Sequence, residues 1–176
     1  MAAAKLQQSA ADATANNLTN ESPLRAYNGP EAYGSIVVNY PKTWSAYVDD
    51  SGSSNTPVDG YFNPGTVPSI GNSTSSIFAL RVQVLNQPYA TVLQTYSSQS
   101  SNQQNPVTIT AYSLPKVPKA VGVELSGTLS NSGSKPVTGT MVILPLRANT
   151  LEIWTDGTQY LSDFNNNILP NFSFSP

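Results

Sequence analysis

Oxygen-bearing side chains gather in one polar stretch of the chain, and they are the residues best suited to hold a cation. They are Asp49, Asp50, Asn55 and Asp59. A hard cation such as Ca²⁺ takes roughly six to eight oxygen ligands, but the spacing fits no EF-hand loop. The alternative is a solvated turn, in which Asp and Asn side chains accept hydrogen bonds from nearby backbone amides. The sequence favours the turn and keeps these four residues as the candidate metal set.

Aromatic side chains are the second group that could recognise a ligand, by stacking on sugars or peptides. The chain has two tryptophans and nine tyrosines. Tyr27, Tyr33 and Tyr61 fall near expected loops, so they are the candidates for an exposed binding surface. Trp44 and Trp154 lie within predicted strands, and large aromatic residues in such positions usually belong to the core. We expect the two tryptophans to be buried.

Two pairs of carboxylates could support the acid–base chemistry of glycoside hydrolysis. They are Asp156 with Asp163, and Glu124 with Glu152. Each has a simpler interpretation, because Asp156 precedes a predicted helix and can cap it, while Asp163 is expected to face solvent. Glu124 and Glu152 alternate with apolar neighbours, which places them on an outer face of a sheet. A hydrolase is therefore the less favoured class.

Other catalytic chemistry is limited by composition, since the chain contains no histidine and no cysteine. This removes the usual proton shuttle at neutral pH and the thiolate nucleophile. A Ser/Lys dyad needs neither, but Ser132, Ser134 and Lys135 lie together in an expected hairpin loop. The sequence predicts no catalytic residue, no cofactor and no enzyme activity.

Charge is sparse in this chain, at 10% of residues and a net charge of −2. A typical globular domain carries about a quarter charged residues, so solubility here depends on Ser, Thr, Asn and Gln. No basic patch is present to bind nucleic acid, and no apolar run reaches the roughly 18 residues of a membrane span. Residues 1–5 lack the apolar core of a signal peptide. We expect an extracytoplasmic domain at a cell surface, whose N-terminal transmembrane anchor precedes Ala2 in the native protein.

These residues are expected to be positioned by a domain over residues 24–176. Residues 2–16 are rich in good helix formers with one large apolar residue, Leu6, and predict a polar helix. With the linker that follows, they make a stalk over residues 1–23. From there on, β-branched and alternating segments predict strands. The strands are expected at 35–40, 44–48, around 61–62, and at 77–85, 107–112, 121–129, 137–146 and 151–154.

The clearest strand, 77–85, alternates between two faces. Phe78, Leu80, Val82 and Val84 share one face, and Arg81 and Gln83 share the other. Pro88 then suits the first turn of a helix, and 89–96 carries apolar residues at helical spacing. A second amphipathic helix is expected over 158–169. Strands in this order with two helices predict an α+β fold, a mostly antiparallel sheet flanked by helices.

One segment resembles a known family. The stretch Tyr40-Pro41-Lys42-Thr43-Trp44 between two strands is similar to the opening hairpin of the PsbP-like superfamily. The resemblance continues in strand 77–85 with its following helix, and ends in Asn171-Phe172-Ser173-Phe174. It covers the chain from Tyr33 onward, and it implies an antiparallel sheet sandwiched by helices. Histidine and acidic features linked to manganese or calcium in photosynthetic members cannot be carried over, because this chain has no histidine.

The resemblance also extends to uncharacterised membrane-anchored surface proteins of bacteria. It therefore favours a non-catalytic, extracytoplasmic domain with a binding or structural role. The expected partner is a protein or another cell-surface component, with no contact to nucleic acid, and with the membrane only through the anchor. The alternative is the headpiece of a pilin-like filament subunit, whose polar helix would lead into an antiparallel sheet.

Overall fold

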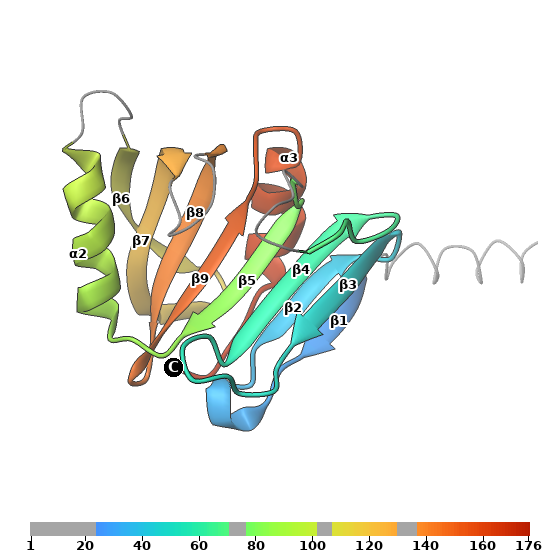
Figure 1. The fold of residues 1–176 in the computed structure, drawn as a ribbon, viewed down its shortest axis with the longest axis horizontal. Helices are drawn as coiled ribbons and strands as arrows, with labels where there is room; N and C mark the ends of the chain where they lie inside the picture. Colours follow the sequence, from blue (N-terminus) through green and yellow to red (C-terminus); the bar gives the residue numbers. More distant parts are fainter. Residues whose placement is uncertain (1–23, 71–76, 102–106, 130–136) are drawn as a thin grey trace, which may run out of the picture.

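The computed structural model describes residues 24–70, 77–101, 107–129 and 137–176. Two antiparallel sheets make up most of it (Figure 1). The smaller sheet pairs β1 (Leu24–Asn28) with β2 (Val37–Pro41). The larger sheet has seven strands in the order β3-β4-β5-β9-β8-β7-β6. Its strands are β3 (Trp44–Asp49), β4 (Val58–Pro64), β5 (Leu80–Leu85), β6 (Val107–Leu114), β7 (Val117–Leu129), β8 (Val137–Leu146) and β9 (Asn149–Thr155).

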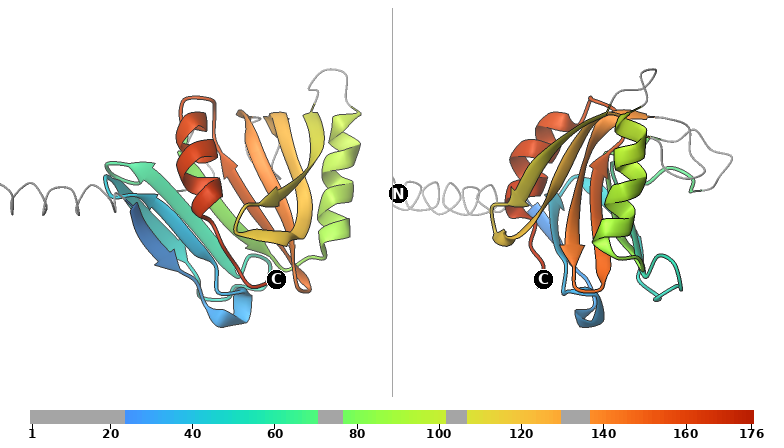
Figure 2. Two further views of the ribbon diagram at one scale, coloured as in Figure 1. Left: turned by 180° about the vertical axis from the view of Figure 1, so that it is seen from behind. Right: turned by 90° about the vertical axis from the view of Figure 1, so that its left-hand side faces the viewer.

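Helices lie on opposite faces of the large sheet (Figure 2). Helix α2 (Tyr89–Ser100) begins after Pro88, as the sequence predicts. The closing helical segment is three short pieces in succession, α3 (Leu161–Asp163), the single π-helical turn η2 (Phe164–Ile168) and the 3₁₀ turn η3 (Leu169–Asn171). A further 3₁₀ turn, η1 (Glu31–Tyr33), joins β1 to β2. The α+β class, with an antiparallel sheet between helices, is confirmed.

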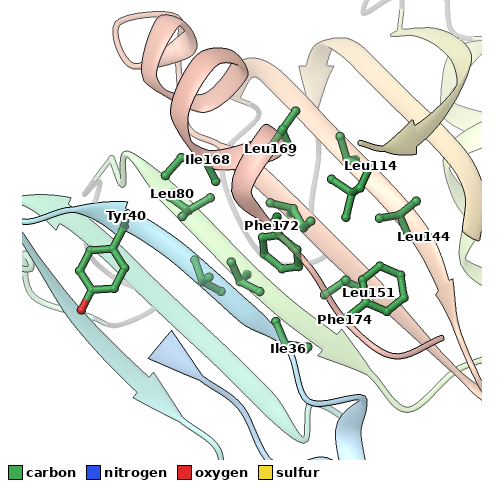
Figure 3. Close-up of a cluster of buried hydrophobic side chains, with 14 of the residues drawn as sticks. Ile36, Tyr40, Leu80, Leu114, Leu144, Leu151, Ile168, Leu169, Phe172 and Phe174 are labelled. Atoms are coloured by element: carbon green, nitrogen blue, oxygen red, sulfur yellow. The ribbon is translucent and has the colours of Figure 1, made fainter. Parts of the chain in front are cut away.

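The main core fills the space between the large sheet, the small sheet and the C-terminal segment (Figure 3). Leu80, Val82 and Val84 of β5 point into it, as their alternation predicts. Phe62, Phe164 and Phe172 are fully buried there. Trp44 is 5% exposed and Trp154 is 3% exposed, so both tryptophans are buried as expected.

A second, smaller core lies between α2 and the opposite face of the sheet. Val92 and Tyr96 of α2 pack there against Leu125, Met141 and Ile143, with Trp154 at its margin. The apolar stripe expected on this helix is thus confirmed. Within the described part of the chain, no helix combines the length and apolar character that crossing a bilayer requires.

Some expectations differ from the structure. The strands on either side of Lys42-Thr43 do not form the expected hairpin, because β2 pairs with β1 and β3 pairs with β4. The strand at 24–28 was not anticipated, because Leu24–Asn28 has no regular alternation. The expected helix at 2–16, the stalk over 1–23 and the hairpin turn at 130–133 lie outside the described residues.

Candidate functional site

The face of the large sheet that carries α2 divides into two halves. Helix α2 packs against β6, β8 and β9, whereas β3, β4 and β5 present polar and aromatic side chains on the same face. Cross-strand register aligns Tyr47, Tyr61, Arg81 and Trp154 in one row. A second row aligns Asp49, Asp59, Gln83 and Glu152. We call the side chains of Tyr47, Asp49, Asp59, Tyr61, Arg81 and Gln83 the β3–β5 face.

Arg81 lies at the centre of this face, within a cage of aromatic rings. Its guanidinium carbon is 3.6 Å from the ring centroid of Tyr61 and 4.8 Å from that of Trp154. Phe78 stands 5.7 Å away and makes an edge contact with Tyr61. Each separation is within the range at which a cation is attracted to a ring face. The cage holds Arg81 in a fixed orientation.

Hydrogen bonds fix the same guanidinium group from its edge. Its Nε donates to the backbone oxygen of Gly60 at 3.2 Å, and Nη2 donates to a carboxylate oxygen of Asp59 in an ion pair. The Tyr61 hydroxyl also donates to Asp59 at 3.0 Å. Asp59 therefore binds both the cation and one wall of its cage, which makes the face a connected network.

Asp156 anchors the other two walls. Its carboxylate accepts from Nε1 of Trp154 and from the backbone N–H of Phe78, each at 3.1 Å. Burial raises the pKa of Asp156, and the hydrogen bond from Phe78 and the charge of Arg81 oppose this. The sequence-based interpretation of Asp156 as a helix cap is wrong, because α3 begins after Tyr160 and has no side-chain cap.

Glu152 is the second residue whose position was misjudged. The expected place on an outer face is wrong: the residue is 3% exposed and lies beneath α2. Tyr96 donates a hydrogen bond to it, while Oε1 finds no hydrogen-bond partner among the described residues. Burial raises the pKa of Glu152 to about 7, against the opposing effects of Tyr96 and Arg81.

Of the four candidate metal ligands, Asp49 and Asp59 are register partners on β3 and β4, and each of the four is engaged in a hydrogen bond or ion pair of its own. Asp49 accepts a hydrogen bond from the backbone N–H of Ser51 at 3.1 Å, and its pKa is lowered by the side-chain hydrogen bond from Ser51 first and by this backbone bond second. Asp50 accepts from Tyr27 at 2.9 Å, and Asp59 is paired with Arg81. The backbone oxygen of Asn55 accepts from the N–H of Asn86. Across the described residues, no three acidic side chains are grouped to hold a metal.

The three candidate tyrosines occupy different places. Tyr27 and Tyr33 are partly buried against the main core. The Tyr27 hydroxyl reaches Asp50, and its pKa is raised by burial first and by Asp50 second. The Tyr33 hydroxyl lies against Gly52, in the β3–β4 loop. Only Tyr61 is part of the β3–β5 face.

Tyr27→Phe tests whether the first of these contacts is structural. The hydrogen bond to Asp50 is exposed, and a typical hydrogen bond contributes about 1 kcal/mol to stability. We expect the free energy of unfolding, measured by urea denaturation, to fall by about 1 kcal/mol or less. A change above about 2 kcal/mol would show that Tyr27 has a larger structural role than this contact explains.

Sequence reasoning missed Arg81, Phe78 and Tyr47. Arg81 is the only charged residue in the 77–85 segment, and an arginine within so apolar a strand is a signal that it needs partners. Phe78 was assigned to the same face as Leu80, but the strand begins only at Leu80. The backbone before that point turns the Phe78 ring toward Tyr61 and Arg81 instead.

Comparisons with known proteins find similarity only at the level of structure. No protein-family model matches the chain, and no curated protein matches its sequence. A cyanobacterial PsbP, CyanoP of Synechocystis sp. PCC 6803, is 12% identical with a TM-score of 0.47, over 87% of this chain and 93% of that one. LpqN of Mycobacterium tuberculosis, described as involved in cell envelope biogenesis, is 16% identical with a TM-score of 0.48, over 92% and 96%.

A third similar structure comes from Bacteroides thetaiotaomicron, at 10% identity and a TM-score of 0.47. The match covers 88% of this chain and 49% of that protein, so this chain spans about half its length. The likeness to all three is confined to the fold. It identifies no ligand.

Proposed function

We propose that this protein is a non-catalytic, extracytoplasmic binding domain, and that the β3–β5 face holds a segment of a partner protein that presents Lys or Arg. The observation that carries the proposal is the row of Tyr47, Tyr61 and Arg81 beside the facing carboxylates of Asp49 and Asp59. The first three form a ladder in which Arg81 lies over the ring of Tyr61 and the rings of Tyr61 and Tyr47 meet at a tilt. The last two supply negative charge along its side.

Tyr47 is the part of this ladder most available to a partner. Its side chain is 53% exposed, and its ring centroid lies 6.2 Å from that of Tyr61. A tyrosine held in this way offers a rigid surface that is apolar on its ring and polar at its hydroxyl, and such residues are enriched where proteins bind each other. Tyr47 therefore has the exposure and the chemistry of a contact residue.

Charge favours a basic partner. Asp49 and Asp59 stand directly opposite each other in the β3–β4 register, and like charges so placed repel. Arg81 pairs with Asp59, whereas Asp49 accepts hydrogen bonds from Ser51, through its side chain and its backbone N–H, and pairs with no cation among the described residues. One negative charge is thus left on the face without a cation. A lysine or arginine from a partner would compensate it and could also stack on Tyr47.

Composition and site chemistry support binding rather than catalysis. The chain has no histidine or cysteine, and Asp59, Asp156 and Glu152 are engaged with Arg81, with Trp154 and Phe78, and with Tyr96 respectively. A surface that relies on hydroxyl and amide groups instead of charge fits a location outside the cytoplasm. The proposal joins these properties to the β3–β5 face.

A titration followed by NMR tests this function. The ¹⁵N-labelled protein is titrated with a lysine-rich peptide and, separately, with a glutamate-rich peptide of equal length. We expect amide shifts in β3, β4 and β5 with the lysine-rich peptide only, and weaker binding as salt is raised. Shifts with the glutamate-rich peptide, or with a neutral oligosaccharide in place of the lysine-rich peptide, would contradict the proposed partner chemistry.

Tyr47→Ala should reduce the affinity for the lysine-rich peptide by about tenfold, since an aromatic contact residue is worth about 1–2 kcal/mol in such interfaces. Asp49→Asn should weaken binding mainly at low salt. The matched control is Val121→Ala, because Val121 is 59% exposed and lies on β7, which is separated from β5 by β9 and β8 in the sheet. Equal losses for Tyr47→Ala and Val121→Ala would reject the β3–β5 face as the binding surface.

A further inference from the structure

Helix α2 rests on the sheet through a small apolar contact. Only Val92 and Tyr96 of its residues are buried. They meet Leu125, Met141 and Ile143 on the sheet. A helix of this length is marginal in water by itself, so the packing against the sheet has to supply most of its stability.

The sequence of α2 adds little stability of its own. The hydroxyls of Ser97, Ser98 and Ser100 donate to backbone oxygens one turn earlier, a pattern that slightly destabilises helices. The N-terminal end of the helix has no side-chain cap, and neither end has a complementary charge. The element is therefore drawn from the less stable part of the fold, where local opening requires the smallest free energy.

A carboxyl group lies within this apolar contact. Glu152 is 3% exposed, and its register neighbours on β5 and β8 are Gln83 and Ile143. From above, Tyr96 of α2 donates a hydrogen bond to it. One of its oxygens, Oε1, is buried and has no hydrogen-bond partner among the described residues. A neutral carboxyl group tolerates such a site far better than a charged one does.

We propose that α2 is a proton-controlled cover of the sheet, firmly seated while Glu152 is protonated and loosened when Glu152 ionises. Loosening would give the carboxylate access to water and would uncover the apolar surface of Leu125, Met141 and Ile143. The proposal concerns the covered half of the sheet and goes beyond binding at the β3–β5 face.

The groups that face Glu152 compensate its charge only in part. Helix α2 offers only Tyr96 and Tyr89, which are neutral, and β8 has no ionisable residue. From β5 the nearest charge is Arg81, which already pairs with Asp59. Asp156, which directly follows β9, adds a second acid and not a cation. No cation in the described part of the chain is thus dedicated to Glu152.

The direction of the pH effect follows from linkage. Burial raises the pKa of Glu152 from its ordinary value of 4.5 to about 7 in the closed state. Below pH 4.5 the protonated carboxyl group stabilises the closed state fully. This stabilisation is lost as the pH rises from 4.5 to about 7, and above about pH 7 it changes no further. Over this window the opening equilibrium increases about tenfold for each pH unit.

Hydrogen exchange of the amides in α2 provides the test. We expect protection factors there to fall on the order of a hundredfold between pH 5 and pH 7.5 and then to level off, with β7 and β8 little changed. In Glu152→Gln the protection factors of the α2 amides should stay high over the whole pH range. In Tyr96→Phe the carboxylate loses a donor that lowers its pKa, so levelling off should occur at a higher pH.

Glu124→Gln is the matched control, because Glu124 is another glutamate whose pKa burial raises, and it pairs with Val142 on the opposite face of the sheet. This variant should retain the pH dependence in α2. The proposal is overturned if protection in α2 does not depend on pH, or if the dependence survives in Glu152→Gln. Should Glu152→Gln fail to fold, an unshifted profile in Tyr96→Phe would overturn it equally.

Discussion

Replacing Phe172 with alanine should lower the free energy of unfolding by about 4 kcal/mol, the usual magnitude for a buried phenylalanine. Phe172 is 0% exposed and lies in the main core, in the segment that follows the closing helical turns (Figure 3). Its removal would leave a cavity bounded by three separate elements, the two sheets and the helical segment. Such a site cannot collapse readily, because each wall is held by its own hydrogen bonds.

The expected effect is large because the C-terminal segment is hydrogen-bonded to the small sheet and packs in the main core with residues of the large sheet. Val37 and Ser173 exchange backbone hydrogen bonds of 2.8 and 3.2 Å, and Ser175 donates to the oxygen of Gly34 at 2.7 Å. Asn39 adds a side-chain bond to the oxygen of Asn171 at 2.6 Å. Phe172 lies between these contacts and anchors the segment. Its loss should therefore increase hydrogen exchange in β1 and β2 beyond the increase in β7 and β8.

Chemical denaturation measures the free energy, and two variants serve as controls. Phe172→Leu keeps most of the volume and should lose about 1–2 kcal/mol. Ser173→Ala keeps the backbone hydrogen bonds and should change stability by less than about 0.5 kcal/mol. A loss below about 1 kcal/mol for Phe172→Ala would mean that the segment does not hold the two sheets together.

Much of the sheet was predictable because alternation is a local signal. In the 137–146 and 151–154 segments, β-branched and aliphatic residues mark strands without reference to any partner. The pairing of strands is not local, and this explains the error at Lys42-Thr43. A two-residue connection between two strands is typical of a hairpin, yet here the chain passes from one sheet to the other.

The site was less predictable than the fold. Alternation correctly placed Arg81 and Gln83 on one face, but it could not show that Tyr61 and Trp154 flank Arg81. It also misplaced Glu152, because alternation of polar and apolar residues predicts an exposed face only where nothing covers the strand. Both faces of β9 are covered, one by the main core and the other by α2. Which polar residue is buried depends on packing between distant elements.

Arg81→Met should lower the free energy of unfolding by about 3 kcal/mol at neutral pH. Breaking a buried ion pair typically costs about 3–5 kcal/mol because the remaining charge is left without a partner. The lower end applies here, since the side chains of Arg81 and Asp59 are 13% and 24% exposed. Methionine keeps much of the contact with the rings, so the loss reports mainly on charge and hydrogen bonding.

The loss of unfolding free energy in Arg81→Met should be smaller at pH 4 than at pH 7. The charge of Arg81 lowers the pKa values of Glu152 and Asp156, so its removal raises both and makes their ionisation in the folded state less favourable. A group whose pKa is raised on folding stabilises the protein only while it is protonated. Hence the variant should lose stability with rising pH more steeply than the parent protein, as urea denaturation over this pH range would show.

Arg81→Lys separates charge from shape. A lysine keeps the positive charge but has no planar group to lie against Tyr61, and it cannot donate to Gly60 and Asp59 in the same fixed geometry. We expect it to recover about half of the loss. Arg147→Met is the matched control, because the hydrogen bond from Arg147 to the oxygen of Glu31 is exposed and should be worth about 1 kcal/mol or less. If Arg81→Met is no more destabilising than Arg147→Met, the ion pair and hydrogen bonds of Arg81 contribute no more to stability than an exposed contact does, and the expected role of Arg81 in the fold is wrong.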